Sequence, residues 1–322
     1  MAKALAMISG GLDSILAAKL IKEQGIEVLG ICFRSYFFSE ESAIKMTKQI
    51  DIPLLVVDFS PEHLELVKNP KHGRGKNMNP CIDCHAMMMN YAGKLLEEHN
   101  ADFIITGEVL NQRPMSQNRQ ALNIVKKESG FANKILRPLC AKNMDPTEME
   151  LSGMVDREKL LNITGRSRKP QMELASKWGI TEYPSPAGGC KLTEPNYALR
   201  LKDLLTFKDE VEEDELSLLR YGRHFRTEDN NKIIVARTKE ESENHESLIF
   251  TQSDINQFLK TKSAAHTMVA FLLEEVGLTL NDLDKFYVAG AFGVHLDIES
   301  AVTIGMYPDL PREKFECPGN SS

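Results

Sequence analysis

Short apolar runs alternate with amphipathic stretches over the first 140 residues. The short apolar runs are typical of strands buried on both faces of a parallel sheet. The amphipathic stretches repeat apolar residues every three to four positions, as helices that cover such a sheet do. The predicted strands are 4–8, 28–33, 54–59, 103–106 and 135–139, and the predicted helices are 15–24, 40–50, 86–99 and 117–127. This alternation predicts a doubly wound, mainly parallel α/β sheet, in which ligands bind at the carboxyl ends of the strands.

The pattern becomes less regular further along the chain. Residues 183–190 contain two prolines and two glycines, which predicts a loop. A long helix is predicted to start at the cap Asp254 and to stop at Gly277, and Asp297 is predicted to cap a short helix. The other predicted elements are helices at 160–165, 171–178, 197–205 and 213–221, strands at 232–236 and 288–293, and a linker at 239–246. We therefore expect three parts: a sheet domain at 1–180, a small α+β unit at 181–250 and a C-terminal segment at 251–322.

A Ser-Gly-Gly-Leu-Asp-Ser run at 9–14 joins the first predicted strand to the first predicted helix. A helix N-terminus offers unpaired backbone N–H groups and the positive end of a dipole, so it suits phosphate. The two glycines let the backbone approach an anion closely, and the two serines add hydroxyl donors. A carboxylate among phosphates makes sense chiefly as a ligand of Mg²⁺, and we assign that role to Asp13. No Gly-Lys-Ser/Thr sequence follows, so the run is not a Walker A loop.

The chain has six cysteines, and in a reducing compartment they favour metal binding or catalysis over disulfides. Cys81 and Cys84 stand at the predicted start of a helix, where the helix N-terminus favours thiolate. Cys190 lies in the glycine-rich loop. Three thiolates would leave one iron of a [4Fe–4S] cluster free to hold sulfide. Alternatively, one cysteine carries a persulfide and another resolves it as a disulfide, or the three thiols are unrelated. The remaining cysteines are expected to be buried small hydrophobes: Cys32, Cys140 and Cys317.

Charge and hydropathy narrow the class of protein. The net charge of −7 argues against a general nucleic-acid coat. No apolar run approaches the ~20 residues that a membrane helix needs, and the N-terminus lacks the pattern of a signal peptide, so we expect a cytoplasmic protein. Two basic clusters are candidates for RNA contact or for ordinary solvated loops: Lys71, His72, Arg74 and Lys76, and Arg166, Arg168 and Lys169.

Several of these segments resemble, in order, the PP-loop tRNA thiolases. The resemblance rests on residues 9–14, 73–84, 106–117 and 186–190, and it covers about residues 1–250. The closest group is related to the adenylation domain of tRNA 4-thiouridine synthetase and to 2-thiouridylases. It implies an enzyme that uses ATP to adenylylate a uridine carbonyl and replaces the oxygen with sulfur. It also implies Mg²⁺, tRNA and a sulfur donor, either sulfide or a persulfide carrier. An ATP-dependent amidase or ligase, or a nucleotide or iron–sulfur binding protein, remains the alternative.

The resemblance also assigns roles to residues. Phe33 would lie near the adenine and Gly107 under the nucleotide, while Asp13 and Cys190 would be catalytic. Residues 287–297 and 304–309 resemble the end of corrinoid-protein reductive activators, which are similar to actin/hexokinase-like ATPases. Their other phosphate loops are absent from the sequence, so independent ATP hydrolysis is not expected there. The implied ATP and Mg²⁺ ligands are Ser9, Gly10, Gly11, Asp13 and Ser14, and the implied cluster ligands are Cys81, Cys84 and Cys190.

Overall fold

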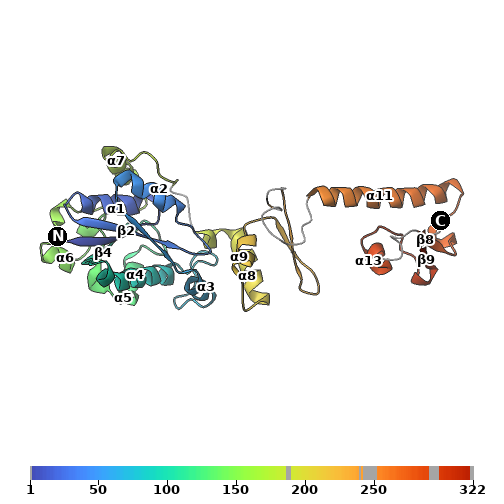
Figure 1. Ribbon diagram of the computed structural model, residues 1–322, viewed down its shortest axis with the longest axis horizontal. Coiled ribbons are helices and arrows are strands. Elements are labelled where there is room, and N and C mark those ends of the chain that lie inside the picture. The colour runs from blue at the N-terminus through green and yellow to red at the C-terminus, as the bar shows by residue number, and fades with distance from the viewer. Residues whose placement is uncertain (1, 186–189, 239–240, 242–251, 290–296, 320–322) are drawn as a thin grey trace. The chain divides into compact units, whose positions relative to one another are not determined.

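The computed structural model describes residues 2–185, 190–238, 241, 252–289 and 297–319 (Figure 1). The chain divides into two compact units, Met1–Arg220 and Tyr221–Ser322. The part boundaries expected after residues 180 and 250 stay predictions. Most of the predicted linker at 239–246 lies outside the described residues, and so do residues 290–293 of the strand predicted at 288–293.

The first unit is built on a five-stranded sheet in the order β3-β2-β1-β4-β5. Every neighbouring pair is parallel, and β1 is paired on both sides, for example through Ala4 with Val28 and with Phe103. The strands are β1 (Lys3–Met7), β2 (Glu27–Arg34), β3 (Leu54–Asp58), β4 (Phe103–Thr106) and β5 (Ile135–Leu136). The predicted doubly wound parallel sheet is therefore confirmed.

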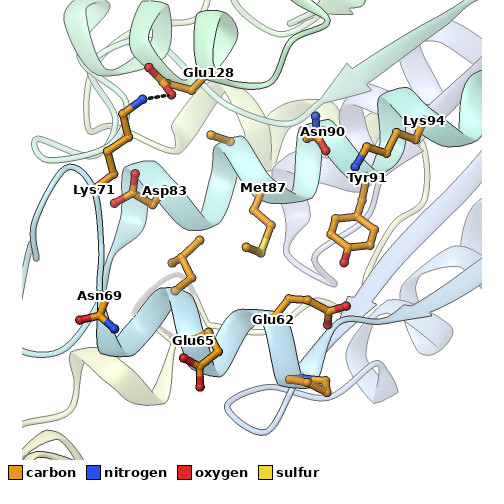
Figure 2. A pocket seen from close by; sticks show the side chains of 13 residues that line it. Glu62, Glu65, Asn69, Lys71, Asp83, Met87, Asn90, Tyr91, Lys94 and Glu128 are labelled. Atoms are coloured by element: carbon orange, nitrogen blue, oxygen red, sulfur yellow. Dashed lines mark hydrogen bonds and ion pairs between the residues drawn. The ribbon is translucent and has the colours of Figure 1, made fainter.

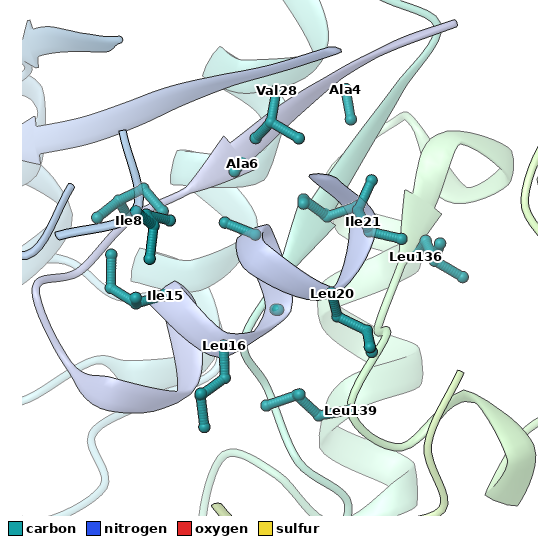
Figure 3. Close-up of a cluster of buried hydrophobic side chains, with 14 of the residues drawn as sticks. Ala4, Ala6, Ile8, Ile15, Leu16, Leu20, Ile21, Val28, Leu136 and Leu139 are labelled. Atoms are coloured by element: carbon teal, nitrogen blue, oxygen red, sulfur yellow. The ribbon is translucent and has the colours of Figure 1, made fainter. Parts of the chain in front are cut away.

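Helices cover both faces of this sheet (Figure 1). Ala4 and Ala6 point into a core shared with α1, where Ile15 and Leu16 are fully buried (Figure 3). The intervening Leu5 points to the other face, into a second core that contains side chains of α4 and α5. This alternation follows from the two-residue period of a strand. The helices of this unit are α1 (Leu12–Lys22), α2 (Glu41–Ile50), α3 (Ser60–Lys68), α4 (Cys81–Glu98), α5 (Arg119–Glu128), α6 (Glu148–Leu151), α7 (Lys169–Lys177), α8 (Pro195–Phe207) and α9 (Glu213–Leu218).

Three helix predictions need correction. Helix α3 was not predicted, although Ser60 followed by a proline is a typical helix start. Helix α4 begins at Cys81, five residues earlier than predicted, directly after Pro80. The helix predicted at 160–165 is wrong: Thr164 forms a parallel bridge with Leu110 instead, and the backbone turns at Gly165 with a φ of 85°.

A third core packs the segment 190–219 against the rest of the first unit. It contains side chains of α8 and α9 together with Phe37, Met78 and Leu192. A backbone hydrogen bond reinforces it, because Met78 N donates to Leu192 O at 3.1 Å. The residues that directly follow Cys190 are thereby held against residues 77 and 78.

The second unit contains two small sheets and one long helix. An antiparallel hairpin pairs β6 (Arg223–Arg226) with β7 (Lys232–Val235), and β8 (Phe286–Ala289) runs parallel to β9 (Phe315–Gly319). The predicted cap Asp297 is confirmed on α13 (Ile298–Thr303), because its carboxylate accepts a hydrogen bond from Ser300 N. The predicted cap Asp254 is wrong, since α11 (Gln252–Glu275) already includes it. None of the described helices is both long and apolar enough to span a membrane.

Candidate functional site

The site lies where the strand order reverses, between β1 and β4. Parallel sheets bind ligands at such a point because the loops on its two sides turn apart and leave a crevice. The turn 9–11 leaves β1 on one side, and Gly107 and Glu108 leave β4 on the other. The sequence therefore placed the glycine turn at the correct edge of the sheet.

The glycine turn ends in an open helix N-terminus. Gly11 is the N-cap of α1, and no side chain accepts a hydrogen bond from the first amides of the helix. Gly10 has a φ of 77°, and a Cβ there would lie 2.6 Å from the Cβ of Ser42. The Ser42 hydroxyl donates to Gly10 O at 3.1 Å, and the Ser14 hydroxyl donates to Gly11 O at 2.7 Å. The turn is thus held rigidly from two sides, and the Gly11 amide donates a long hydrogen bond to Ser9 Oγ at 3.4 Å. The open first turn of α1 suits an anion.

Gly107 packs directly on the first turn of α1. A Cβ at Gly107 would lie 2.4 Å from Ser14 N and 2.6 Å from the carbonyl carbon of Asp13. No side chain fits in that space, so glycine lets the end of β4 support the glycine turn. The contact with nucleotide assigned to Gly107 stays a prediction, and this packing is an independent reason for a glycine.

Asp13 is held by a polar network that the sequence did not predict. Its two carboxylate oxygens accept hydrogen bonds from Gln112 Nε2 at 2.6 Å and from Arg168 Nη2 at 3.0 Å. Gln171 is fully buried, and its Nε2 donates to Gln112 Oε1 at 2.7 Å. Gln112 stands inside the segment 106–117 that carried the family resemblance, so that segment was the available signal. Arg168 belongs to a basic cluster for which RNA contact and a solvated loop were the two alternatives, and in the structure its Nη2 donates to Asp13.

Phe33 belongs to the core of the sheet. It lies inside β2, which continues to Arg34, and only 5% of the residue is exposed. Its ring packs edge-on against Phe59 and Tyr91, with centroid distances of 5.3 and 6.3 Å. The assigned position of Phe33 near the adenine stays a prediction, and its ring packs into the core of the sheet.

The three predicted sulfur residues are brought together. Cys81 and Cys84 form the first turn of α4. Cys190 reaches them because the residues that follow it are tied to the segment before α4: Asn77 Nδ2 donates to Thr193 O at 2.7 Å, next to the backbone bond between residues 78 and 192. The three thiols lie within electrostatic reach, since a charge on Cys190 or Cys81 raises the pKa of Cys84.

Burial determines the ionisation of these thiols. Burial raises the pKa of Cys84 well above its usual value, and Cys190, Cys81 and Asp83 raise it further. Burial also raises the pKa of Cys190 to about 11. At Cys81 burial raises the pKa and the Arg113 guanidinium opposes this effect. The thiolate predicted from the helix N-terminus is therefore not favoured in the metal-free protein, because desolvation outweighs the helix dipole.

The other three cysteines differ in how deeply they are buried. Cys32 and Cys140 are buried as predicted. Cys317 is only partly buried on β9, so that prediction is wrong. Among the described residues, no three His, Cys, Asp or Glu side chains form a group that could hold a metal ion.

A buried charge network connects the two halves of the site. Glu108 follows the glycine at the end of β4 and accepts hydrogen bonds from Arg137 Nε at 2.9 Å, while the His85 Nδ1 atom lies 2.9 Å from its other oxygen. Burial alone would raise the pKa of Glu108, but Arg137 and His85 overcome it and hold the pKa at about 2. His85 directly follows Cys84 on α4. The network therefore fixes the cysteine helix to the strand that supports the glycine turn.

The basic cluster at 71–76 is largely paired within the protein. Lys71 Nζ lies 2.6 Å from Glu128, and the His72 ring lies 2.5 Å from Asp83. Arg74 donates to the carbonyl groups that end α3. A groove of about 800 Å³ lies beside this cluster, between α3 and α4 (Figure 2). Its lining includes the carboxylates Glu62, Glu65, Asp83 and Glu128, so it does not suit RNA phosphate.

The fold and the site define a doubly wound α/β domain with a phosphate-type turn at its switch point and a thiol site alongside. Residues 1–149 match the family model described as thiamine biosynthesis protein (ThiI). Residues 199–322 match the model described as the C-terminal domain of RACo, the ASKHA domain. Both resemblances drawn from the motifs are confirmed, although the second match begins well before residue 252. The ThiI match ends before the Cys190 loop.

Individual relatives match over parts of their length. A "Probable tRNA sulfurtransferase" of Finegoldia magna is 31% identical over 156 residues, 46% of this chain and 37% of the relative. The tRNA-specific 2-thiouridylase MnmA of Bacillus thuringiensis is 26% identical over 223 residues, 62% of this chain and 54% of the relative. A crystal structure of a 4-thiouridine synthetase–RNA complex with bound ATP is 20% identical, with a TM-score of 0.36, and the match covers 56% of this chain and 52% of that one. The chain thus spans between about a third and a half of the curated relatives it matches.

Proposed function

We propose that this protein is an ATP-dependent tRNA sulfurtransferase that adenylylates a uridine carbonyl and replaces its oxygen with sulfur. One observation carries the proposal: a glycine turn of the phosphate-binding type and three thiols occur in the same unit, connected through Gly107, Glu108 and His85. The names of the relatives point to the same chemistry. The nucleotide and sulfur halves of such a reaction need to be close, because the adenylate must be attacked before water hydrolyses it.

In the first step the uridine carbonyl oxygen attacks the α-phosphorus of ATP. The bond to the bridging oxygen of the β-phosphate breaks, and pyrophosphate leaves. The backbone amides after Gly10 and Gly11 stabilise charge on the phosphates. Asp13 is the proposed ligand of Mg²⁺, which would neutralise the leaving pyrophosphate.

In the second step sulfur attacks the activated carbon of uridine, and AMP leaves with the former carbonyl oxygen. The sulfur donor is sulfide or a persulfide carrier. On the persulfide route, one cysteine carries the terminal sulfur, and a second cysteine then attacks the mixed disulfide and forms a protein disulfide. A separate thiol reductant restores the two cysteines for the next turnover.

The thiol site also fits a [4Fe–4S] cluster in its donor chemistry. Cys81, Cys84 and Cys190 are soft ligands, and a cluster binds each thiolate through a different iron, so they need not converge on one ion. Metal coordination deprotonates a thiol outright. Burial by itself has the opposite effect on these thiols, because it raises their pKa. Such a cluster would supply an open iron for sulfide. Anaerobic purification with iron counting and absorption spectroscopy tests this choice: loss of iron in Cys190→Ser is expected on the cluster route, and iron-free active protein contradicts it.

The main experiment supplies ATP, Mg²⁺ and bulk tRNA, with either sulfide or a persulfide donor plus a thiol reductant, and follows pyrophosphate together with thiolated nucleosides by mass spectrometry. Asp13→Ala is expected to abolish both products. Cys190→Ser is expected to keep pyrophosphate release and lose thiouridine, while Cys317→Ser, in the second unit, is expected to keep both. Full thiolation by Cys190→Ser would refute the sulfur chemistry and favour an amidase or ligase. ATP binding without pyrophosphate release would indicate a nucleotide-binding protein.

A further inference from the structure

We propose that Arg168 binds the β- and γ-phosphates of ATP, and the pyrophosphate product, after releasing Asp13 to Mg²⁺. The inference rests on the proposed function and adds a second phosphate ligand to the glycine turn. In the nucleotide-free protein the same guanidinium neutralises the carboxylate that the metal later needs.

The ion pair with Asp13 does not use every hydrogen-bond donor of the Arg168 guanidinium. Its Nη2 lies 3.0 Å from Asp13 Oδ1, and the two side chains are 18% and 16% exposed. Its Nε is buried and has no hydrogen-bond partner among the described residues. Guanidinium has five donors in a flat fork that matches phosphate oxygens. The side chain therefore retains an unused donor beside the uncapped N-terminus of α1.

The backbone around Arg168 is fixed to this edge. Gly165 N donates to Leu110 O at 2.9 Å, and the Thr164 hydroxyl donates to the same carbonyl at 3.0 Å. On the other side α7 begins at Lys169, and its Ala175 is fully buried in the core shared with α1. Arg168 thus stands on a short segment held at both ends, so that only its side chain needs to move.

Metal binding at Asp13 forces that movement. Gln112 holds the other carboxylate oxygen, and Gln171 fixes the orientation of the Gln112 amide. Mg²⁺ and a guanidinium cannot share Asp13 Oδ1 without strong repulsion at this distance. The displaced guanidinium then has the phosphates of the metal-bound nucleotide as its nearest anions. A charge-assisted, forked contact of this kind is strong and specific for phosphate.

The test compares three ligands in the presence of Mg²⁺ by calorimetry: ATP, inorganic pyrophosphate and AMP. Arg168→Gln is expected to weaken pyrophosphate and ATP about 10- to 100-fold, the range for a lost charge-assisted hydrogen bond. AMP affinity should stay within twofold, because AMP lacks the phosphates in question. Arg166→Gln removes a neighbouring exposed charge and is the matched control, expected to stay within twofold for all three ligands.

Three results would overturn the inference. Unchanged pyrophosphate affinity in Arg168→Gln contradicts it, equal losses for AMP and pyrophosphate show a structural role only, and equal losses in Arg166→Gln show a general charge effect. If Arg168→Gln does not fold, Arg168→Lys decides, because it keeps the charge without the fork: selective pyrophosphate weakening supports the proposal, and unchanged affinity contradicts it. Wild-type protein that binds neither ATP nor pyrophosphate instead refutes the proposed function itself.

Discussion

Replacing Gly107 by alanine tests whether the end of β4 sets the position of the glycine turn. The added Cβ would lie 2.4 Å from Ser14 N, whereas ordinary Cβ contacts begin near 3.4 Å, so the backbone must separate by about 1 Å. All three nearest atoms are backbone atoms of α1, which cannot rotate away. Overpacking of this kind costs about 1–3 kcal/mol, and we expect the upper end of that range. A displacement of 1 Å at the turn is also expected to lower pyrophosphate release about 100-fold.

The assay is urea unfolding at pH 7, followed by circular dichroism, together with pyrophosphate release. Gly11→Ala is the matched control for stability, since a Cβ there meets only Ser9 Oγ, at 3.5 Å. Its φ of −84° suits any residue, and we expect a loss below about 1 kcal/mol at this helix cap. A Gly107→Ala protein as stable as Gly11→Ala would show that the two segments separate easily and would refute the packing argument.

Two further predictions concern stability, and a third concerns the approach of the site cysteines. Arg137→Met leaves Glu108 charged and buried without its main partner. This change should lower the free energy of unfolding at pH 7, measured in urea, by about 3–5 kcal/mol. A loss below about 1 kcal/mol would contradict the buried pair. Burial lowers the pKa of His63 to about 4, so its neutral form adds stability above pH 6.5 that disappears as the pH falls towards 4. His63→Phe should therefore flatten the pH dependence of stability by about 3 kcal/mol over this range, and an unchanged slope would exclude the histidine as its source. Asn77→Gly keeps the positive φ but loses the side-chain hydrogen bond to Thr193 O. We therefore expect mild oxidation to crosslink the site cysteines more slowly, as measured by peptide mass spectrometry. An equal rate would contradict the role of that bond.

Features that repeat along the chain could be predicted from the sequence. Strand runs such as 4–8 are apolar at every position, and the glycine turn carries its own signature, so both were located to within a few residues. Helix α4 was placed too late because Cys81 to His85 do not show an amphipathic pattern. Pro80 directly precedes the helix, and such a residue marks a helix start independently of periodicity.

Contacts between distant polar side chains could not be predicted. Glu108, Arg137 and His85 belong to three different elements, and nothing in their local sequence shows that the sheet order brings them together. The same holds for Asp13 and Arg168, which are separated by 155 residues. Charged residues such as these are usually expected at the protein surface. Only the strand order decides which of them become buried pairs.

The central position of β1 has a consequence for synthesis of the protein. This strand pairs with β2 through Ala4 and Val28, and with β4, which is made later, through Ala4 and Phe103. A growing chain on the ribosome therefore keeps one edge of β1 open until Phe103–Thr106 has emerged. Shielding of that edge by a chaperone or by the ribosome surface is most useful during this interval, and pausing of translation before β4 would prolong it.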